Sequence, residues 1–244
     1  MRITRIHHPE PLAPGQEISL QPQAATHLTR VLRVQAGTEL TLFNGDGNEY
    51  TAVISRVQRN HAWADITHVQ AIDRESPLDI HLGQGISKGD RMDYTIQKAI
   101  ELGVSTITPL MTEHSTVQLK ADRLKKRLKH WQGIIHSACE QCGRNRVPIM
   151  NKPLALEQWL VQIEKSSLKL TLAPNADHSF NTMAAPDADI TLLVGPEGGL
   201  SELEIKLSLE HGFTGLRLGP RILRTETAAV TCLSVIQSRW GDLQ

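Results

Sequence analysis

Between residues 79 and 239 the chain alternates short apolar segments with longer amphipathic ones. The segments 170–173, 190–194 and 216–219 are predominantly apolar, which is typical of strands whose two faces are both buried. The amphipathic segments between them have the length and spacing of helices. This alternation predicts an α/β domain with a mostly parallel sheet covered on both faces. Taken alone, the pattern favours an open, doubly wound sheet.

The first 70 residues have a different pattern, with alternating polar and apolar positions typical of half-buried strands. One short helix is expected around residues 25–34, with Leu28, Val31 and Leu32 on one face. A charged stretch containing Ser76-Pro77 then marks a linker. We therefore expect a small β domain over 1–73 and an α/β domain over 74–244. The strands expected in the small domain are 38–45, 49–58 and 61–70, joined by turns at 44–48 and 59–61.

Composition excludes several classes of protein. The 244 residues carry 26 Lys/Arg and 26 Asp/Glu, so a protein that simply coats polyanions is not expected. Residues 74–150 hold twelve Lys/Arg against eight Asp/Glu, so any nucleic-acid contact should be local. No stretch approaches the ~20 apolar residues of a membrane span. The first residues contain no apolar signal-peptide core, and three cysteines cannot all pair, so a cytoplasmic location is expected.

Two similar stretches follow predicted strands. "ITLLVGPEGGLSELE" (190–204) and "LRLGPRILRTETAAV" (216–230) both run from an apolar strand through Gly-Pro into a helix start. Ligands of α/β sheets bind beyond the carboxyl ends of the strands, where glycines let the backbone approach them. Neither loop ends in the Lys-Ser/Thr of a phosphate cradle, and Glu197 would repel phosphate. With the turn at 173–174, these loops favour an adenine-bearing ligand that is neutral or positive.

A metal or redox site is not expected. Cys139 and Cys142 form C-x-x-C and His136 lies three residues earlier, but no fourth zinc ligand is evident nearby. A redox pair would be expected at the start of a helix after a strand, whereas this pair falls late in the long helix predicted over 121–143.

The two loop motifs are similar to those of the RsmE family, the 16S ribosomal RNA (uracil-N3) methyltransferases of the SPOUT superfamily. "KGDRMDYTIQKAIELGV" (88–104), "EQCGRNRVP" (140–148) and "HLTRVLRVQAGTELTLFNGDG" (27–47) resemble further motifs of that family, in the expected order. The resemblance implies a PUA-like RNA-binding β-barrel over 1–73 and a SPOUT α/β domain with a C-terminal trefoil knot over 74–244. It also implies a homodimer that uses S-adenosyl-L-methionine to methylate 16S rRNA of the small ribosomal subunit.

The resemblance places the cofactor between the three loops. Thr225 is expected to cap the last helix, and Asp90 is expected to cap the helix that ends at Gly103. The cofactor-binding residues implied are Leu172, Ala173, Val194, Gly195, Glu197, Gly198, Gly199, Leu216, Leu218, Gly219, Ile222, Leu223, Thr225 and Ala228.

Candidate catalytic residues are Arg221 and Arg224, which could stabilise negative charge on the target base, and Glu140 and Arg144, which could order the site. The alternative is that these arginines pair with Glu197 or Glu226. The basic stretch 120–131 either holds RNA backbone or is a solvated helix face. Candidate RNA-binding residues in the small domain are Arg2, Arg5, His27, Arg30 and Arg33.

Two other functions remain open from the sequence. A different SPOUT activity, such as ribose 2′-O-methylation or a tRNA base target, is disfavoured by the 140–148 motif and the N-terminal domain. A non-catalytic ribosome-binding factor is disfavoured by intact cofactor loops, and measured affinity for S-adenosylmethionine would separate it from an enzyme.

Overall fold

The computed structural model describes residues 4–115, 121–163, 168–173, 175–187 and 189–243. The chain forms two compact units. One combines residues 1–75 with 136–147, and the other combines 76–135 with 148–244. The N-terminal unit therefore includes a segment from the middle of the chain.

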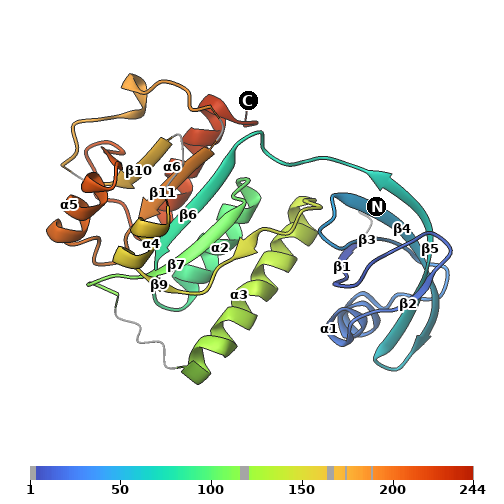
Figure 1. Ribbon diagram of the computed structural model, residues 1–244. Helices are drawn as coiled ribbons and strands as arrows, with labels where there is room; N and C mark the ends of the chain where they lie inside the picture. Colours follow the sequence, from blue (N-terminus) through green and yellow to red (C-terminus); the bar gives the residue numbers. More distant parts are fainter. Residues whose placement is uncertain (1–3, 116–120, 164–167, 174, 188, 244) are drawn as a thin grey trace. The chain divides into compact units, whose positions relative to one another are not determined.

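The N-terminal unit is built on a five-stranded sheet with the order β1-β3-β4-β5-β2 (Figure 1). The three predicted strands are confirmed, and β4 and β5 form a long antiparallel pair. β1 pairs in parallel with β3, which makes the sheet mixed. Alternate side chains, among them Leu40, Leu42 and Ile54, form a buried core. The strands are β1 (Thr4–His7), β2 (Glu17–Ser19), β3 (Glu39–Phe43), β4 (Asn48–Gln58) and β5 (His61–Ala71).

The predicted helix exists, but its apolar face is only partly correct. It starts as α1 (Pro22–Thr26) and continues as a π-helical turn, η1 (His27–Leu32). Leu28 is fully buried, whereas Val31 and Leu32 are 65% and 44% exposed. The wider π turn shifts the register of an α-helix, so these two side chains turn towards solvent.

The C-terminal unit contains a parallel sheet with the order β12-β10-β11-β6-β7-β8, and β9 also pairs with β7. The predicted mostly parallel sheet is thus confirmed. Ile80, Leu82, Leu192 and Leu193 are buried along its central strands, as helices on both faces require. The strands are β6 (Asp79–Gly85), β7 (Thr106–Met111), β8 (Ile149–Met150), β9 (Leu154–Ala155), β10 (Leu168–Leu172), β11 (Asp189–Val194) and β12 (Thr214–Leu216).

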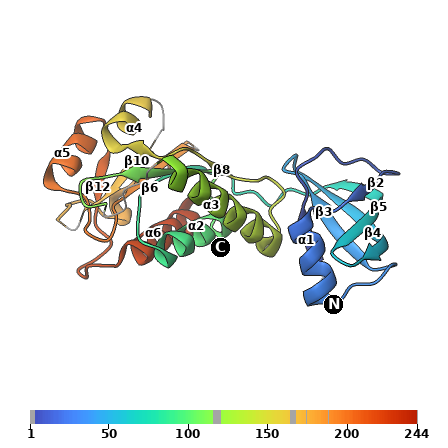
Figure 2. The same cartoon turned by 90° about the horizontal axis from the view of Figure 1, so that it is seen from below.

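Helices cover both faces of this sheet, with α2 and α6 on one side and α4 and α5 on the other (Figure 2). On the second side, Trp159 of α4 packs with Leu110, Leu193 and Phe213. None of the helices in the described part of the chain is long and apolar enough to cross a membrane. The helices are α2 (Asp90–Glu101), α3 (Ala121–Cys142), α4 (Leu156–Gln162), α5 (Glu202–Glu210) and α6 (Thr225–Trp240), with a 3-10 turn η2 (Phe180–Thr182).

Two predicted helix caps are wrong. Gly89 is the N-cap of α2, and Asp90 is already its first helical residue. Arg224 is the N-cap of α6, and the Thr225 hydroxyl donates instead to the Gly195 carbonyl at 2.6 Å. A tertiary hydrogen bond has therefore replaced the local cap.

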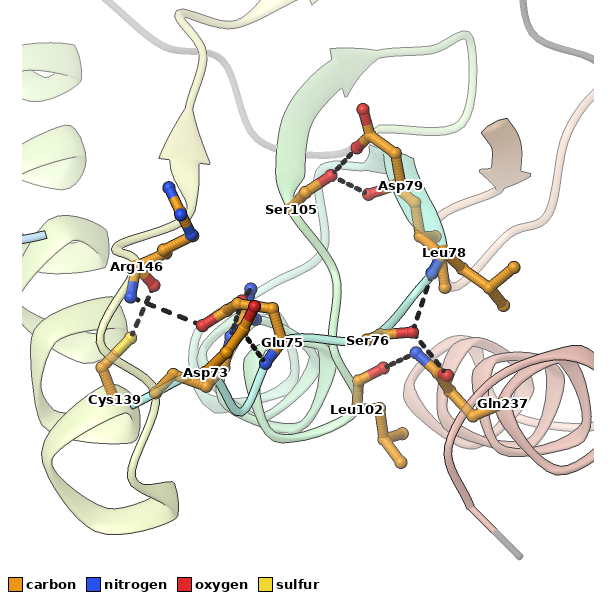
Figure 3. Close-up of polar contacts among 12 residues, drawn as sticks. Asp73, Glu75, Ser76, Leu78, Asp79, Leu102, Ser105, Cys139, Arg146 and Gln237 are labelled. Carbon is orange, nitrogen blue, oxygen red and sulfur yellow. Dashed lines mark hydrogen bonds and ion pairs between the residues drawn. The ribbon is translucent and has the colours of Figure 1, made fainter. Parts of the chain in front are cut away.

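The far end of α6 is fixed by one buried amide. Gln237 accepts a hydrogen bond from the Ser76 hydroxyl at 2.9 Å and donates to the Leu102 carbonyl at 2.8 Å (Figure 3). Leu102 follows α2, so Gln237 ties α6 to the end of α2 and to the segment that precedes β6.

Three histidines in the N-terminal unit lie close together. The His7 ring stacks on His136 with 3.9 Å between centroids and meets Phe43 edge-on. Burial, with the neighbouring His136 and His8, lowers the pKa of His7 to about 4. His8 is 2% exposed, and burial lowers its pKa as well. The folded state therefore holds these rings neutral.

We expect stability to fall as the pH drops from 6.5 towards 4. In this window His7 is protonated in the unfolded chain but neutral in the folded chain, because folding lowers its pKa. Protonation therefore favours unfolding. Urea unfolding measured between pH 7 and pH 4 should show a falling midpoint in the wild type and a smaller fall in His7→Gln. His68→Gln, at an exposed position, should behave as the wild type. Equal pH dependence in His7→Gln and the wild type would contradict this origin.

Candidate cofactor cavity and RNA-binding residues

A cavity of about 320 Å³ opens at the carboxyl ends of β10, β11 and β12. Its wall is made by the turn after β10, the loop 195–199 and the loop 217–225. Every residue that the sequence predicted to bind the cofactor lies in this wall: Leu172, Ala173, Val194, Gly195, Glu197, Gly198, Gly199, Leu216, Leu218, Gly219, Ile222, Leu223, Thr225 and Ala228. Pro196, Leu200, Ile205, Arg217 and Arg221 complete it.

Strand pairing explains why the three loops meet. β10 lies between β11 and β12 and is parallel to both, so the loops that follow these strands leave from the same edge of the sheet. The arrangement has the position that α/β folds commonly use for ligands.

Close backbone contacts shape the loop 195–199. A side chain on Gly195 would place its Cβ 2.8 Å from the backbone of Gly199 and Leu200. A side chain on Gly85, at the end of β6, would come within 2.5 Å of the Pro196 nitrogen. Gly199 and Gly219 have φ angles of +71° and +100°, which side-chain-bearing residues rarely adopt. The glycines of both motifs are thus needed for the cavity's shape.

The acids near the cavity have a partner that the sequence analysis did not single out. Glu197 Oε1 accepts hydrogen bonds from the Lys88 amide at 2.9 Å and from Arg91 Nη1 at 3.0 Å. Partial burial alone would raise the pKa of Glu197, but the backbone amides of Lys88 and Glu197 and the Arg91 guanidinium outweigh it and lower the pKa. Arg91 Nε also lies 4.0 Å from Glu226 Oε1. Arg91 lies in the first turn of α2 and belongs to the 88–104 motif, and that motif was the available signal.

Arg221 and Arg224 differ in position. Arg221 lines the cavity, whereas Arg224 is the exposed N-cap of α6 and lies outside the lining. Among the described residues neither guanidinium forms an ion pair, so pairing of these arginines with Glu197 or Glu226 is wrong. Arg221 is therefore the arginine of the two that the fold makes available to a ligand in the cavity.

Glu140 and Arg144 lie in the N-terminal unit. Arg144 is 6% exposed, and its Nε donates to Glu75 Oε2 at 2.8 Å. Glu140 Oε1 accepts the His7 amide at 3.0 Å, and burial raises the pKa of this carboxyl. Both side chains therefore have well-defined local partners within that unit.

The candidate RNA-binding residues separate into two groups. The Arg5 guanidinium is turned inward, where it pairs with Glu49 and donates to Asn145 Oδ1 at 2.7 Å and to the Gly143 carbonyl at 3.2 Å. His27, Arg30 and Arg33 are exposed on or next to the π turn. Arg2 lies outside the described residues.

Cys139 is buried in the N-terminal unit. Its sulfur faces the Arg146 carbonyl at 4.0 Å (Figure 3), and burial raises the pKa of the thiol to about 12. Such a thiol is a poor nucleophile at neutral pH. Within the described ranges, no group of three or more His, Cys, Asp or Glu side chains is placed to hold a metal ion.

Comparison with known families gives the class of protein. A family described as RNA methyltransferase domain matches residues 74–237, and one described as RNA methyltransferase PUA domain matches residues 20–67. The first match contains the cavity and the parallel sheet, and the second lies within the five-stranded unit. The fold and its domains are those of an RNA methyltransferase of the SPOUT type.

Individual relatives narrow this class. Ribosomal RNA small subunit methyltransferase E of Buchnera aphidicola subsp. Schizaphis graminum is 38% identical, over 99% of this chain and 98% of the relative. A ribosomal RNA small subunit methyltransferase E from Neisseria gonorrhoeae, solved with S-adenosyl methionine, is 40% identical with a TM-score of 0.93, over 100% of both chains. A Legionella pneumophila protein described as a methyltransferase, solved with SAM, is 47% identical with a TM-score of 0.96, also over 100% of both chains. The chain belongs to the RsmE family.

A methyl group added at Gly85 should distort the cavity. Because its Cβ would lie 2.5 Å from Pro196, we expect Gly85→Ala to lower the free energy of unfolding by about 1–3 kcal/mol and to weaken S-adenosylmethionine binding. Chemical denaturation and calorimetric titration measure the two effects. Gly133→Ala is the control, because its Cβ would meet no atom within 4 Å and alanine favours a helix. Unchanged stability and binding in Gly85→Ala would contradict the packing argument.

Proposed function

We propose that this protein transfers a methyl group from S-adenosyl-L-methionine to N3 of a specific uridine in 16S rRNA of the small ribosomal subunit. The observation that carries the proposal is the cavity, where every sequence-predicted cofactor residue meets at one sheet edge. The N. gonorrhoeae relative, solved with S-adenosyl methionine, supports the identity of the cofactor. The cavity fits the ligand chemically. Its wall is lined by glycines and apolar residues, and it includes the carboxylate of Glu197, which favours a cationic ligand.

The chain's own contribution to the reaction is positioning and electrostatics. The sulfonium cofactor supplies an activated methyl group when bound. Uracil N3 attacks only after it loses its proton, so negative charge develops on the base oxygens. Arg221, at the cavity wall, is positioned to stabilise that charge. Arg224 is the second candidate for this role, and Glu140 and Arg144 are the candidates for ordering the site.

We assign RNA binding to the 1–73 domain and methyl transfer to the 74–244 domain. The exposed His27, Arg30 and Arg33 supply contacts to the RNA, whereas Arg5 is engaged inside the N-terminal unit by Glu49 and Asn145. The target uridine has to be unpaired or turned out of its stack to reach the cavity. We further propose a cytoplasmic homodimer and a C-terminal trefoil knot. The hydrogen bond from Thr225 to Gly195 is a contact that such threading would make.

Mass mapping of small-subunit RNA from a strain lacking this protein tests the reaction. One uridine should lose a methyl group in that strain, and purified protein should restore it in the presence of S-adenosylmethionine. Naked rRNA and assembled small subunits, tested side by side, identify the substrate. A protein that binds subunits but has no affinity for S-adenosylmethionine would instead be a non-catalytic binding factor. Methylation of a ribose or of a tRNA would also overturn the proposal.

Removal of the Arg221 side chain tests the electrostatic role. We expect Arg221→Ala to lower kcat by about 100-fold, the size typical of a lost oxyanion donor. Arg221→Lys should retain part of the rate because it keeps the charge. Arg224→Ala, outside the cavity lining, should lose less, and cofactor titration should show that the variants still bind. Wild-type turnover in Arg221→Ala would remove this residue from the mechanism.

A further inference from the structure

Two walls of the cavity are connected by a residue outside its lining. Arg91, in the first turn of α2, donates to Glu197 of the loop 195–199 at 3.0 Å. Its Nε lies 4.0 Å from Glu226, in the first turn of α6. The Lys88 amide adds a hydrogen bond of 2.9 Å to Glu197. The start of α2 thus contacts both the loop 195–199 and the first turn of α6.

A second connection between the same two walls is buried. Gln84, at the end of β6, is 0% exposed. Its Nε2 donates to the Thr225 hydroxyl at 3.1 Å and contacts the Gly195 carbonyl at 3.3 Å. Thr225 itself donates to Gly195 at 2.6 Å, which closes a small ring of hydrogen bonds. Gln84 also lies outside the cavity lining.

These connections leave polar atoms without partners. Gln84 Oε1 and Glu226 Oε2 are buried and accept no hydrogen bond from any described residue. Leaving such an oxygen unsatisfied destabilises the folded state. Gln84 Nε2 also contacts the Gly85 carbonyl at 3.0 Å, so this amide nitrogen serves three acceptors while its own oxygen has no described partner. What Gln84 and Arg91 provide is a fixed spacing between Gly195 and Thr225, and between Glu197 and Glu226.

We propose that Arg91 and Gln84 are positioning residues that set the shape of the cofactor cavity by holding the loop 195–199 against the start of α6. The inference rests on the proposed function, since it takes the cavity to bind S-adenosylmethionine. The two residues act differently. Arg91 is 43% exposed at its side chain and acts through charge, whereas Gln84 acts through buried hydrogen bonds. The Arg91 contribution is therefore sensitive to salt and the Gln84 contribution is not.

Cofactor titration and steady-state kinetics test the two residues in the full-length protein. Arg91→Gln should raise the Kd and KM for S-adenosylmethionine by about fivefold at low salt, as expected for a partly exposed ion pair. Gln84→Met should raise them by about tenfold or more at any salt concentration. The KM for RNA should change little. Arg91→Lys keeps the charge and should recover most of the affinity lost in Arg91→Gln.

The matched control is Lys98→Gln. Lys98 lies on the same helix and forms an ion pair of 2.8 Å with Glu101, and neither residue lines the cavity. The Lys98→Gln variant should bind the cofactor with an unchanged Kd. A double-mutant cycle of Arg91→Gln with Glu197→Gln should give a coupling that disappears in high salt. Thermal unfolding separates loss of fold from loss of positioning.

The outcomes distinguish this inference from the proposed function. If the wild type neither binds S-adenosylmethionine nor methylates rRNA, the proposed function fails. If the wild type does both, and Arg91→Gln and Gln84→Met bind the cofactor as the wild type does, the function stands and the positioning role is wrong. Equal increases in the Kd of Arg91→Gln and Lys98→Gln would also contradict it, because the effect would then belong to α2 in general.

Discussion

The parallel pairing of β10 with β11 on one side and β12 on the other is the interaction on which the cavity depends. It sends three loops, distant in sequence, to the same edge of the sheet. Helices on both faces bury these strands, so their register is fixed by side chains such as Leu170, Leu192 and Leu216. A cavity wall made of loops can be precise only because the sheet beneath it is rigid.

Backbone packing then determines the form of that wall. Gly85 and Gly195 allow main-chain approaches that any side chain would prevent, and Gln84 and Thr225 provide the hydrogen bonds across them. Arg91 adds a charged contact to Glu197 at the surface. The wall thus combines glycine backbone with apolar side chains, which suits recognition of a flat nucleoside. The charged side chains of the wall are Arg217, Arg221 and Glu197, and Glu197 is already bound by Arg91.

The N-terminal unit contains a set of charged groups whose partners lie in the segment 136–147, far along the chain. In the segment 136–147, the Gly143 carbonyl and the Asn145 side-chain oxygen accept hydrogen bonds from the Arg5 guanidinium. The guanidinium of Arg144, in the same segment, pairs with Glu75. A partly buried arginine with several acceptors is far more constrained than one in solvent. This explains why Arg5, predicted as an RNA contact, points inward, while His27, Arg30 and Arg33 remain at the surface.

The sequence by itself determined the alternation of buried strands and helices, the strands of the small unit, and the three loops that follow β10, β11 and β12, because apolar periodicity and Gly-Pro turns are local signals. The individual residues of the cavity wall were implied by the resemblance to the RsmE family. Tertiary structure decided what depends on partners far along the chain. The π turn exposed Val31 and Leu32, Thr225 exchanged a helix cap for the Gly195 carbonyl, and Arg91 became the partner of Glu197. The segment 136–147 joined the N-terminal unit for the same reason. Long-range hydrogen bonds and ion pairs leave no periodic trace in a sequence, so only the folded chain reveals them.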